Sequence, residues 1–303
     1  MKLIHATLLA LLMAGATGAQ AKDSGGEKRA PTEQEELAIA ALEGLMAQPS
    51  ARSLPILKKV MAGSQSTMVK RRALFVLSQQ NSQEARDILL QTARSTNGEL
   101  RGEAIRSIGI SGDAKSLDAL QEIYQAGDAE LKRDVLQAWM IAGRKEAVYQ
   151  AALNAKTEGE ASDAIRMLGV MGAREELRKL GDRPNAPDGL LEAYAISGDL
   201  AGLRKIAETH KDRSTREDAV QRIGIINNDA ARSALREIYA STTDEGIKKA
   251  ALQGMLISQD EKGVLALYRA ATTTEEKRSL LRMLSMMSGD AALEAIDAAL
   301  EKK

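Results

Sequence analysis

A tight-turn signal recurs at steps of 26 to 32 residues along most of this 303-residue chain, each time between two amphipathic segments. Glycine or asparagine occupies most of the turn positions, and Gln259 and Pro49 are the exceptions. A regular period of this length is typical of stacked helical hairpins and is not expected of a globular enzyme. The glycines are Gly112, Gly143, Gly172, Gly198 and Gly289, and asparagine replaces glycine at Asn81 and Asn228.

The sequence around Gly112 predicts how one turn is built. Apolar residues recur at helical spacing before and after this glycine, which predicts two helices that share an apolar face. Glycine readily takes the left-handed conformation that ends a helix, and Asp113 can then accept hydrogen bonds from the free amides of the next helix. The same turn recurs as Ser197-Gly198-Asp199, as Ser288-Gly289-Asp290 and, with asparagine, as Asn227-Asn228-Asp229.

These patterns predict an all-α fold, an α-α superhelix (solenoid) of about nine helical hairpins. Thr32 and Glu35 have the spacing of a capping box, so the first helix is expected to begin there. One hairpin buries too few aliphatic side chains to offset the entropy of ordering its backbone, so the stack must fold as a unit. The expected hairpins cover residues 34–63, 66–95, 98–126, 129–155, 158–181, 187–210, 213–241, 244–271 and 274–301. An apolar residue, alanine in half of the cases, precedes each turn after the first by eight residues: Ala73, Ala104, Val135, Ala164, Leu190, Val220, Ala251 and Leu281.

A basic-x-x-Ala-x-x-x-aliphatic run before a Gly-Asp turn, with two helices per repeat, resembles the HEAT repeats of the short bacterial kind. The segments 69–74 and 131–136 match this pattern best, and the similarity extends over residues 34–301. The resemblance implies a HEAT-like solenoid with a polar ladder between repeats, and it implies little about function. The fifth and sixth units are shorter and are joined by residues 181–188, where two prolines interrupt a helical link. This junction is either a bend between two arms or an ordinary longer loop.

The first 21 residues have the features of a cleavable secretory signal. Lys2 is followed by an apolar stretch that is short for a membrane span, and Ala19-Gln20-Ala21 fits a signal peptidase. We expect cleavage after Ala21, a flexible leader over residues 22–33, and a location in the periplasm or outside the cell. The alternatives are an uncleaved anchor or a buried first helix.

The composition excludes several classes of function. Basic and acidic residues balance at 42 each, which argues against nucleic acid as the partner, and aromatic residues for stacking are few. The chain has no cysteine, and after signal cleavage it has one histidine, His210. No nucleophile elbow or phosphate-binding glycine loop is present. We therefore expect no catalytic residues, cofactor or metal site, and we interpret the methionines as core residues.

A basic position precedes most turns by ten to twelve residues, and stacking would align these positions as a ladder. Each member could pair with a carboxylate of the neighbouring repeat, or the ladder could attract an elongated, charged protein or peptide. Trp139 is a possible anchor for that partner, although its position also fits the core. The chain is thus interpreted as a non-catalytic scaffold. The alternatives are a structural member of a cell-envelope assembly and, with less support, a HEAT-like lyase or glycosylase. The candidate contact residues are Lys70, Arg71, Arg101, Lys132, Arg133, Trp139, Arg216, Lys248, Lys249 and Arg278.

Overall fold

In a computed structural model of the chain, residues 29–96, 98–183, 189–287 and 289–300 are described. Within these ranges every regular element is helical and none is a strand. The first five hairpins are α2 (Glu33–Gly44) with α3 (Ser50–Ala62), α4 (Thr67–Ser78) with α5 (Gln83–Ala93), α6 (Gly98–Ser111) with α7 (Ala114–Ala126), α8 (Ala129–Ile141) with α9 (Lys145–Leu153), and α10 (Glu158–Val170) with α11 (Arg174–Gly181). The other four are α12 (Leu190–Ser197) with α13 (Leu200–Thr209), α14 (Arg213–Ile226) with α15 (Asp229–Ser241), α16 (Glu245–Ile257) with α17 (Glu261–Ala270), and α18 (Thr274–Ser285) with α19 (Asp290–Leu300). A short 3-10 helix, η1 (Leu45–Ala47), follows α2.

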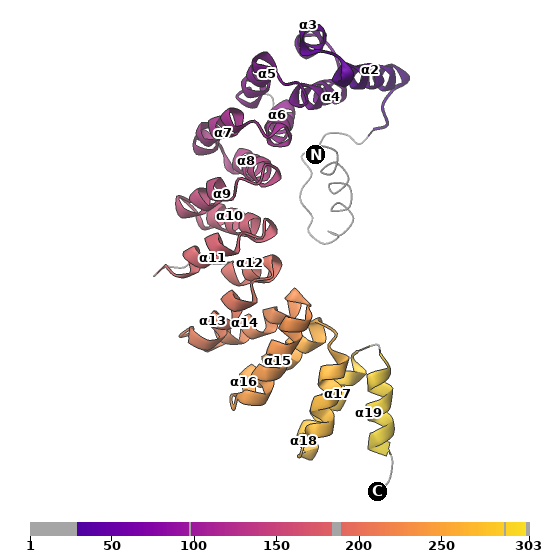
Figure 1. The fold of residues 1–303 in the computed structure, drawn as a ribbon, viewed down its shortest axis with the longest axis vertical. Coiled ribbons are helices and arrows are strands. Elements are labelled where there is room, and N and C mark those ends of the chain that lie inside the picture. Colours follow the sequence, from indigo (N-terminus) through magenta and orange to yellow (C-terminus); the bar gives the residue numbers. More distant parts are fainter. Residues whose placement is uncertain (1–28, 97, 184–188, 288, 301–303) are drawn as a thin grey trace.

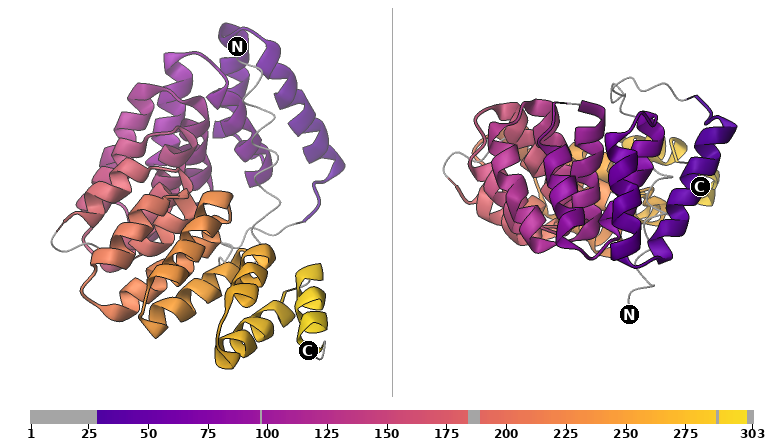
Figure 2. Two further views of the ribbon diagram at one scale, coloured as in Figure 1. Left: turned by 60° about the horizontal axis from the view of Figure 1, so that its bottom comes forward. Right: turned by 90° about the horizontal axis from the view of Figure 1, so that it is seen from above.

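The hairpins stack into an arched superhelix, which confirms the expected fold class (Figure 1). From α2 to α16, each even-numbered helix packs on the next even-numbered helix, and we call this row the even-numbered layer. In Figure 1 its members α4 to α14 lie along the inner side of the arch, with α5 to α13 outside them. Figure 2 shows the same two layers of helices from two further directions.

Small residues set how closely neighbours in the even-numbered layer approach. A Cβ added at Gly109 would lie 2.8 Å from Ala138 Cα of the next repeat, and one added at Gly169 would lie 3.0 Å from Ala193 Cα. Between α8 and α10 the equivalent positions are Met140 and Met167, and there the helices approach less closely. From α6 to α16, close and looser interfaces therefore alternate.

The core is continuous from the first hairpin to the last. Seven of the eight apolar positions that precede the turns by eight residues are buried, and Leu281 is partly buried beside the fully buried Leu280. The capping box also forms: Thr32 Oγ1 accepts from the amide of Glu35 at 3.3 Å, and the Glu35 carboxylate accepts from the amide of Thr32 at 2.9 Å.

Most of the predicted left-handed and capping residues of the turns are confirmed, and two of the predictions are wrong. Gly112, Gly143, Gly172 and Gly198 have φ between +61° and +70°, and Asp113 accepts from the amide of Ser116 at 2.9 Å. The prediction for Asn228 was wrong by one residue. Asn227 is the left-handed residue (φ +48°), and Asn228 caps α15 by accepting from the amide of Ala231. Asn81, predicted to replace glycine, does not have a positive φ.

Gln259 takes the left-handed conformation with φ +51°, although it carries a side chain. Glycine avoids the clash between Cβ and the carbonyl that costs other residues about 1–2 kcal/mol in this region. We expect Gln259→Gly to raise the free energy of unfolding by about 1 kcal/mol, measured by urea denaturation. The reverse exchange, Gly112→Gln, is expected to lower it by a similar amount, because nothing lies near Gly112 and conformation alone is changed.

Three sequence predictions lie mainly outside the described residues. They are the signal (residues 1–21), most of the flexible leader, and the proline-containing part of the junction, residues 184–188. Before that junction α11 ends at Gly181, and after it α12 begins at Leu190. Among the helices that the structure describes, none is both long and apolar enough to cross a bilayer.

Candidate interaction surface

Several even-numbered helices expose a stripe of charged and apolar side chains, which α10 illustrates. On α10 this stripe begins with Glu158, continues with Arg166 one turn before the helix end, and ends with Val170. The acidic residue lies in the first turn, where it complements the helix dipole. The apolar residue lies two positions before the left-handed Gly172. The stripe is thus in register with the turn.

The apolar end of the stripe recurs at the same offset on six consecutive even-numbered helices. Val170 is 58% exposed, and Ile196, Ile225 and Ile257 are 43 to 46% exposed. Sequence analysis missed this row, although the signal was present as an aliphatic residue two positions before each turn from Gly112 to Gln259. We call it the apolar row: Ile110, Ile141, Val170, Ile196, Ile225 and Ile257.

Three of the predicted basic residues pair with carboxylates of the next repeat. Lys132 Nζ lies 2.6 Å from a carboxylate oxygen of Glu160, and the nearest atoms of Arg133 and Asp163 are 3.8 Å apart. A guanidinium nitrogen of Arg101 lies 4.0 Å from a carboxylate oxygen of Asp128, which also belongs to the next repeat. For these residues the polar ladder implied by the HEAT resemblance is present.

Lys132 belongs to the interior of that ladder rather than to an open surface. It is 8% exposed, and its ammonium also lies 5.5 Å from the centre of the Tyr124 ring. The hydrogen bond from Lys132 lowers the pKa of Glu160, whereas burial raises the pKa of Tyr124 to about 12. A lysine this enclosed ties two repeats together and is a poor contact for a partner.

The structure contradicts the placement of Trp139 on a contact face. Its side chain is 1% exposed, its Nε1 donates to the carbonyl oxygen of Leu117 at 3.3 Å, and its ring packs on Tyr124 with centroids 5.3 Å apart. Trp139 is a core residue because it lies on the face of α8 that is turned toward α7, as its spacing from Gly143 also allowed.

The other predicted basic residues fall into two groups. Arg216 donates to the backbone carbonyl oxygens of His210 and Lys211, and Lys248 pairs with Glu245 on its own helix. Four have no ion pair within the described part of the chain: Lys70, which is half-buried, and Arg71, Lys249 and Arg278, which are exposed.

The odd-numbered helices carry a second ladder, which holds the turn of the following repeat. Arg178 on α11 donates from Nε to Asp199 at 2.7 Å, and Arg236 on α15 does the same to Asp260 at 2.7 Å. Both aspartates are nearly completely buried and cap the helix that follows. One turn earlier, Arg174 binds the carbonyl oxygen of Ser197, and Arg232 binds that of Ser258. The sequence prediction of a ladder on the even-numbered helices had missed this one.

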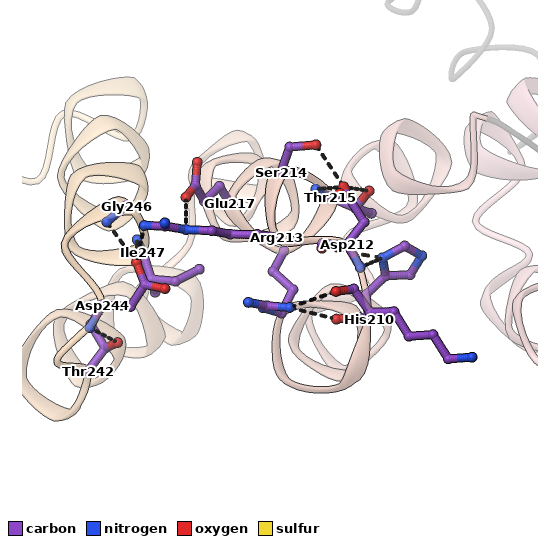
Figure 3. Close-up of polar contacts among 12 residues, drawn as sticks. His210, Asp212, Arg213, Ser214, Thr215, Glu217, Thr242, Asp244, Gly246 and Ile247 are labelled. Atoms are coloured by element: carbon purple, nitrogen blue, oxygen red, sulfur yellow. Dashed lines mark hydrogen bonds and ion pairs between the residues drawn. The ribbon is translucent and has the colours of Figure 1, made fainter.

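His210 lies in a polar cluster between repeats, drawn in Figure 3. Its Nδ1 accepts from the amide of Asp212, and Asp212 in turn caps α14. Hydrogen bonds from Ser214 and Thr215 lower the pKa of Asp212 to about 2. Arg213 bridges Glu217 and Asp244 at 2.9 and 2.7 Å. These polar groups therefore have capping and linking roles.

A groove of about 880 Å³ lies between α7 and α9 on the odd-numbered side. Asp118 and Arg144 form an ion pair within it, and Lys145 and Gln150 lie along its wall. Asp118 and Arg144 satisfy one another, which leaves them less free to fix the orientation of a small ligand. No group of three metal-ligating side chains occurs within the described ranges.

The model of the HEAT repeats family matches residues 54–139, which span α3 to α8. These residues are thus HEAT repeats, and hairpins of the same all-α superhelical design continue to residue 300. No curated protein matches the chain.

Solved structures with similar folds include human deoxyhypusine hydroxylase in complex with glycerol (15% identity, TM-score 0.30), covering 75% of this chain and 98% of that one. Another is the complex of CpcE and CpcF of phycocyanin lyase from Nostoc sp. (18% identity, TM-score 0.34), covering 88% of this chain and 99% of that one. At these TM-scores no conclusion about function follows from either.

Proposed function

We propose that this chain is a non-catalytic scaffold that binds a protein or peptide partner on the even-numbered layer. The observation that carries this proposal is the apolar residue that recurs at the same offset on six consecutive even-numbered helices, with arginines beside it on α6, α10 and α14. A surface built from many similar stripes offers numerous weak contacts to one elongated partner. Arginine, glutamate and aliphatic side chains in rows suit recognition of another chain, and acidic residues along the stripes disfavour nucleic acid.

We propose further that the protein is exported, with residues 1–21 as its signal. Support comes from the sequence alone: a short apolar stretch followed by a small-x-small site ending at Ala21. Expression of the full chain in a Gram-negative host and mass spectrometry of the periplasmic fraction test this directly. A mature protein that begins at Lys22 is expected, and retention of residues 1–21 on a cytoplasmic product would contradict it.

Arg71 and Lys249 provide the test of binding, because both are exposed on the even-numbered layer and neither has an ion pair within the described residues. The mature chain is used as bait on the envelope fraction, and the captured partner is then measured in a purified system. Charge reversal in Arg71→Glu with Lys249→Glu is expected to slow partner association several-fold at low salt, since charged groups act mainly on the association rate. The matched control reverses the charges of Lys59 and Lys262 on the odd-numbered helices, and it should leave the association rate unchanged. Capture of no protein, or equal effects of both pairs, would contradict the proposal.

One observation favours the alternative of a structural assembly. The first and last hairpins expose large apolar side chains: Leu37 is 73% exposed, Leu293 68% and Leu300 75%. Apolar end faces on a solenoid allow copies to join end to end. Sedimentation velocity distinguishes the two functions. End-to-end assembly gives oligomers whose size increases with protein concentration, and Leu37→Ser is expected to reduce that size.

A further inference from the structure

The apolar row has no explanation in the folding of the chain itself. Its members lie at the ends of their helices. Val170, Ile196, Ile225 and Ile257 are 43 to 58% exposed, and Ile110 and Ile141 are partly exposed, so the row contributes little to the core. All six are isoleucine or valine, which form helices less readily than alanine or leucine. Isolated exposed aliphatic residues are ordinary, but a row in one register on neighbouring helices is a feature of binding surfaces.

A second row runs beside the apolar row on alternate helices. Arg106, Arg166 and Arg222 lie three or four residues before the apolar residue on α6, α10 and α14, so each occupies the adjacent position on the exposed stripe. The side chain of Arg166 is 61% exposed, although it also bonds Asp163 of its own helix. Four residues before the apolar residue, α8, α12 and α16 carry Gln137, Glu192 and Gln253, whereas α14 carries Gln221 there and its Arg222 one position later. A ligand on the apolar row therefore meets a cation at every second helix.

The spacing of packed helices limits what can lie along these rows. Neighbouring helix axes are about 8–10 Å apart, so the apolar row presents one side chain at about that interval. A polyproline II segment returns to the same face every third residue, which is about 9 Å along its axis. A β-strand returns to the same face after about 6.7 Å and falls out of register.

An amphipathic helix fits less well for two reasons. Its apolar face carries anchors at i, i+3, i+4 and i+7, which require a groove wider than a single line of side chains. The row is one residue wide and is bordered by arginines, and the layer that carries it is arched from α4 to α14 (Figure 1). A straight helix would leave such a surface after a few contacts, whereas an extended chain can follow it.

We propose that the apolar row binds an extended, polyproline II-like protein segment with an apolar residue at every third position and acidic residues on the flank that faces the arginines. This inference rests on the proposed scaffold function and specifies the chemistry of its partner. Because the arginines occur on alternate helices, an acidic side chain on every second turn of the segment satisfies them.

A labelled synthetic peptide of six Leu-Pro-Glu triplets provides the probe, with fluorescence anisotropy on the mature chain as the measurement. We expect it to bind at least tenfold more tightly than a shuffled peptide of the same composition. Ile196→Ser with Ile225→Ser is expected to weaken its binding at least tenfold, whereas Ile56→Ser, on α3 and 49% exposed, leaves it unchanged. Arg166→Glu with Arg222→Glu should transfer the preference to a Leu-Pro-Lys peptide. Circular dichroism confirms that each variant is folded.

Failure of the triplet peptide to bind, or equal binding of the shuffled peptide, would overturn the proposal. Tighter binding of an amphipathic helical peptide of similar composition would do the same. If the partner captured from the envelope binds the Ile196→Ser, Ile225→Ser variant as tightly as the parent chain, the extended-segment proposal fails while the scaffold function stands. If neither a captured partner nor the peptide binds, both fail.

Discussion

Replacing Gly224 with alanine is expected to destabilise the protein by about 2 kcal/mol, although alanine is the better helix former. Gly224 lies within α14, and a Cβ placed on it would lie 2.7 Å from Gly254 Cα on α16 and closer still to the carbonyl oxygen of Gly254. A backbone contact cannot rotate away, so the two helices must separate. Overpacking of this kind costs about 3 kcal/mol, against about 1 kcal/mol gained in helix propensity.

Gly159→Ala supplies the control. Gly159 is also inside a helix, but a Cβ there would meet nothing nearer than Thr157 Oγ1 at 3.9 Å. This substitution is expected to be neutral or to stabilise by up to about 1 kcal/mol. Urea denaturation followed at 222 nm gives both values. Equal stability of the two variants would show that the approach of α14 to α16 is not set by these glycines.

The close contact between Gly224 and Gly254 is part of a second, longer period in the chain, which spans two hairpins. Gly169 against Ala193 and Gly224 against Gly254 are equivalent pairs two hairpins apart. The buried caps Asp199 and Asp260, each held by an arginine of the preceding repeat, follow the same spacing. Two hairpins therefore form the structural unit in this part of the chain, and the alternate placement of arginine beside the apolar row reflects it.

Local sequence chemistry was enough to predict the hairpins. Gly112 and Asp113 end one helix and begin the next through interactions within a few residues, so their roles follow from the sequence alone. The error at Asn227 and Asn228 has a physical reason. Asparagine is suited both to the left-handed conformation and to capping, so two adjacent asparagines do not reveal which residue has which role.

The interaction surface was harder to predict because it depends on contacts between repeats. Arg101 and Arg106 are both basic residues of α6, yet Arg101 lies beside Asp128 of the next repeat and Arg106 faces outward. Which of two arginines one turn apart becomes a ladder residue depends on the position of the neighbouring hairpin. The apolar row was missed for a different reason, since an aliphatic residue near a helix end can lie in the core or on the surface, and the sequence alone does not show which.

Asp199→Ala is expected to have the largest effect of a single polar substitution, with a loss of about 3 kcal/mol. The carboxylate of Asp199 is 1% exposed, accepts from the amide of Gly202 at 3.1 Å, and is held by two nitrogens of Arg178. Its removal eliminates a helix cap and the link between the fifth and sixth repeats. The side chain of Arg178 is 48% exposed and can return to water, so the loss falls at the lower end of the range for broken buried pairs.

Asp128→Ala is the matched comparison, because Asp128 also caps a helix, by accepting from the amide of Leu131 at 2.8 Å. Its side chain is 66% exposed and its distance to Arg101 is 4.0 Å, so the expected loss is that of a cap alone, about 1 kcal/mol. The difference between the two variants, measured as a shift in the urea midpoint, isolates the contribution of burial and of the arginine. If Arg178→Met costs as much as Asp199→Ala and the double variant costs no more than either, the pair acts as one unit that joins the repeats. Additive losses would show instead that the cap and the ion pair stabilise the superhelix independently.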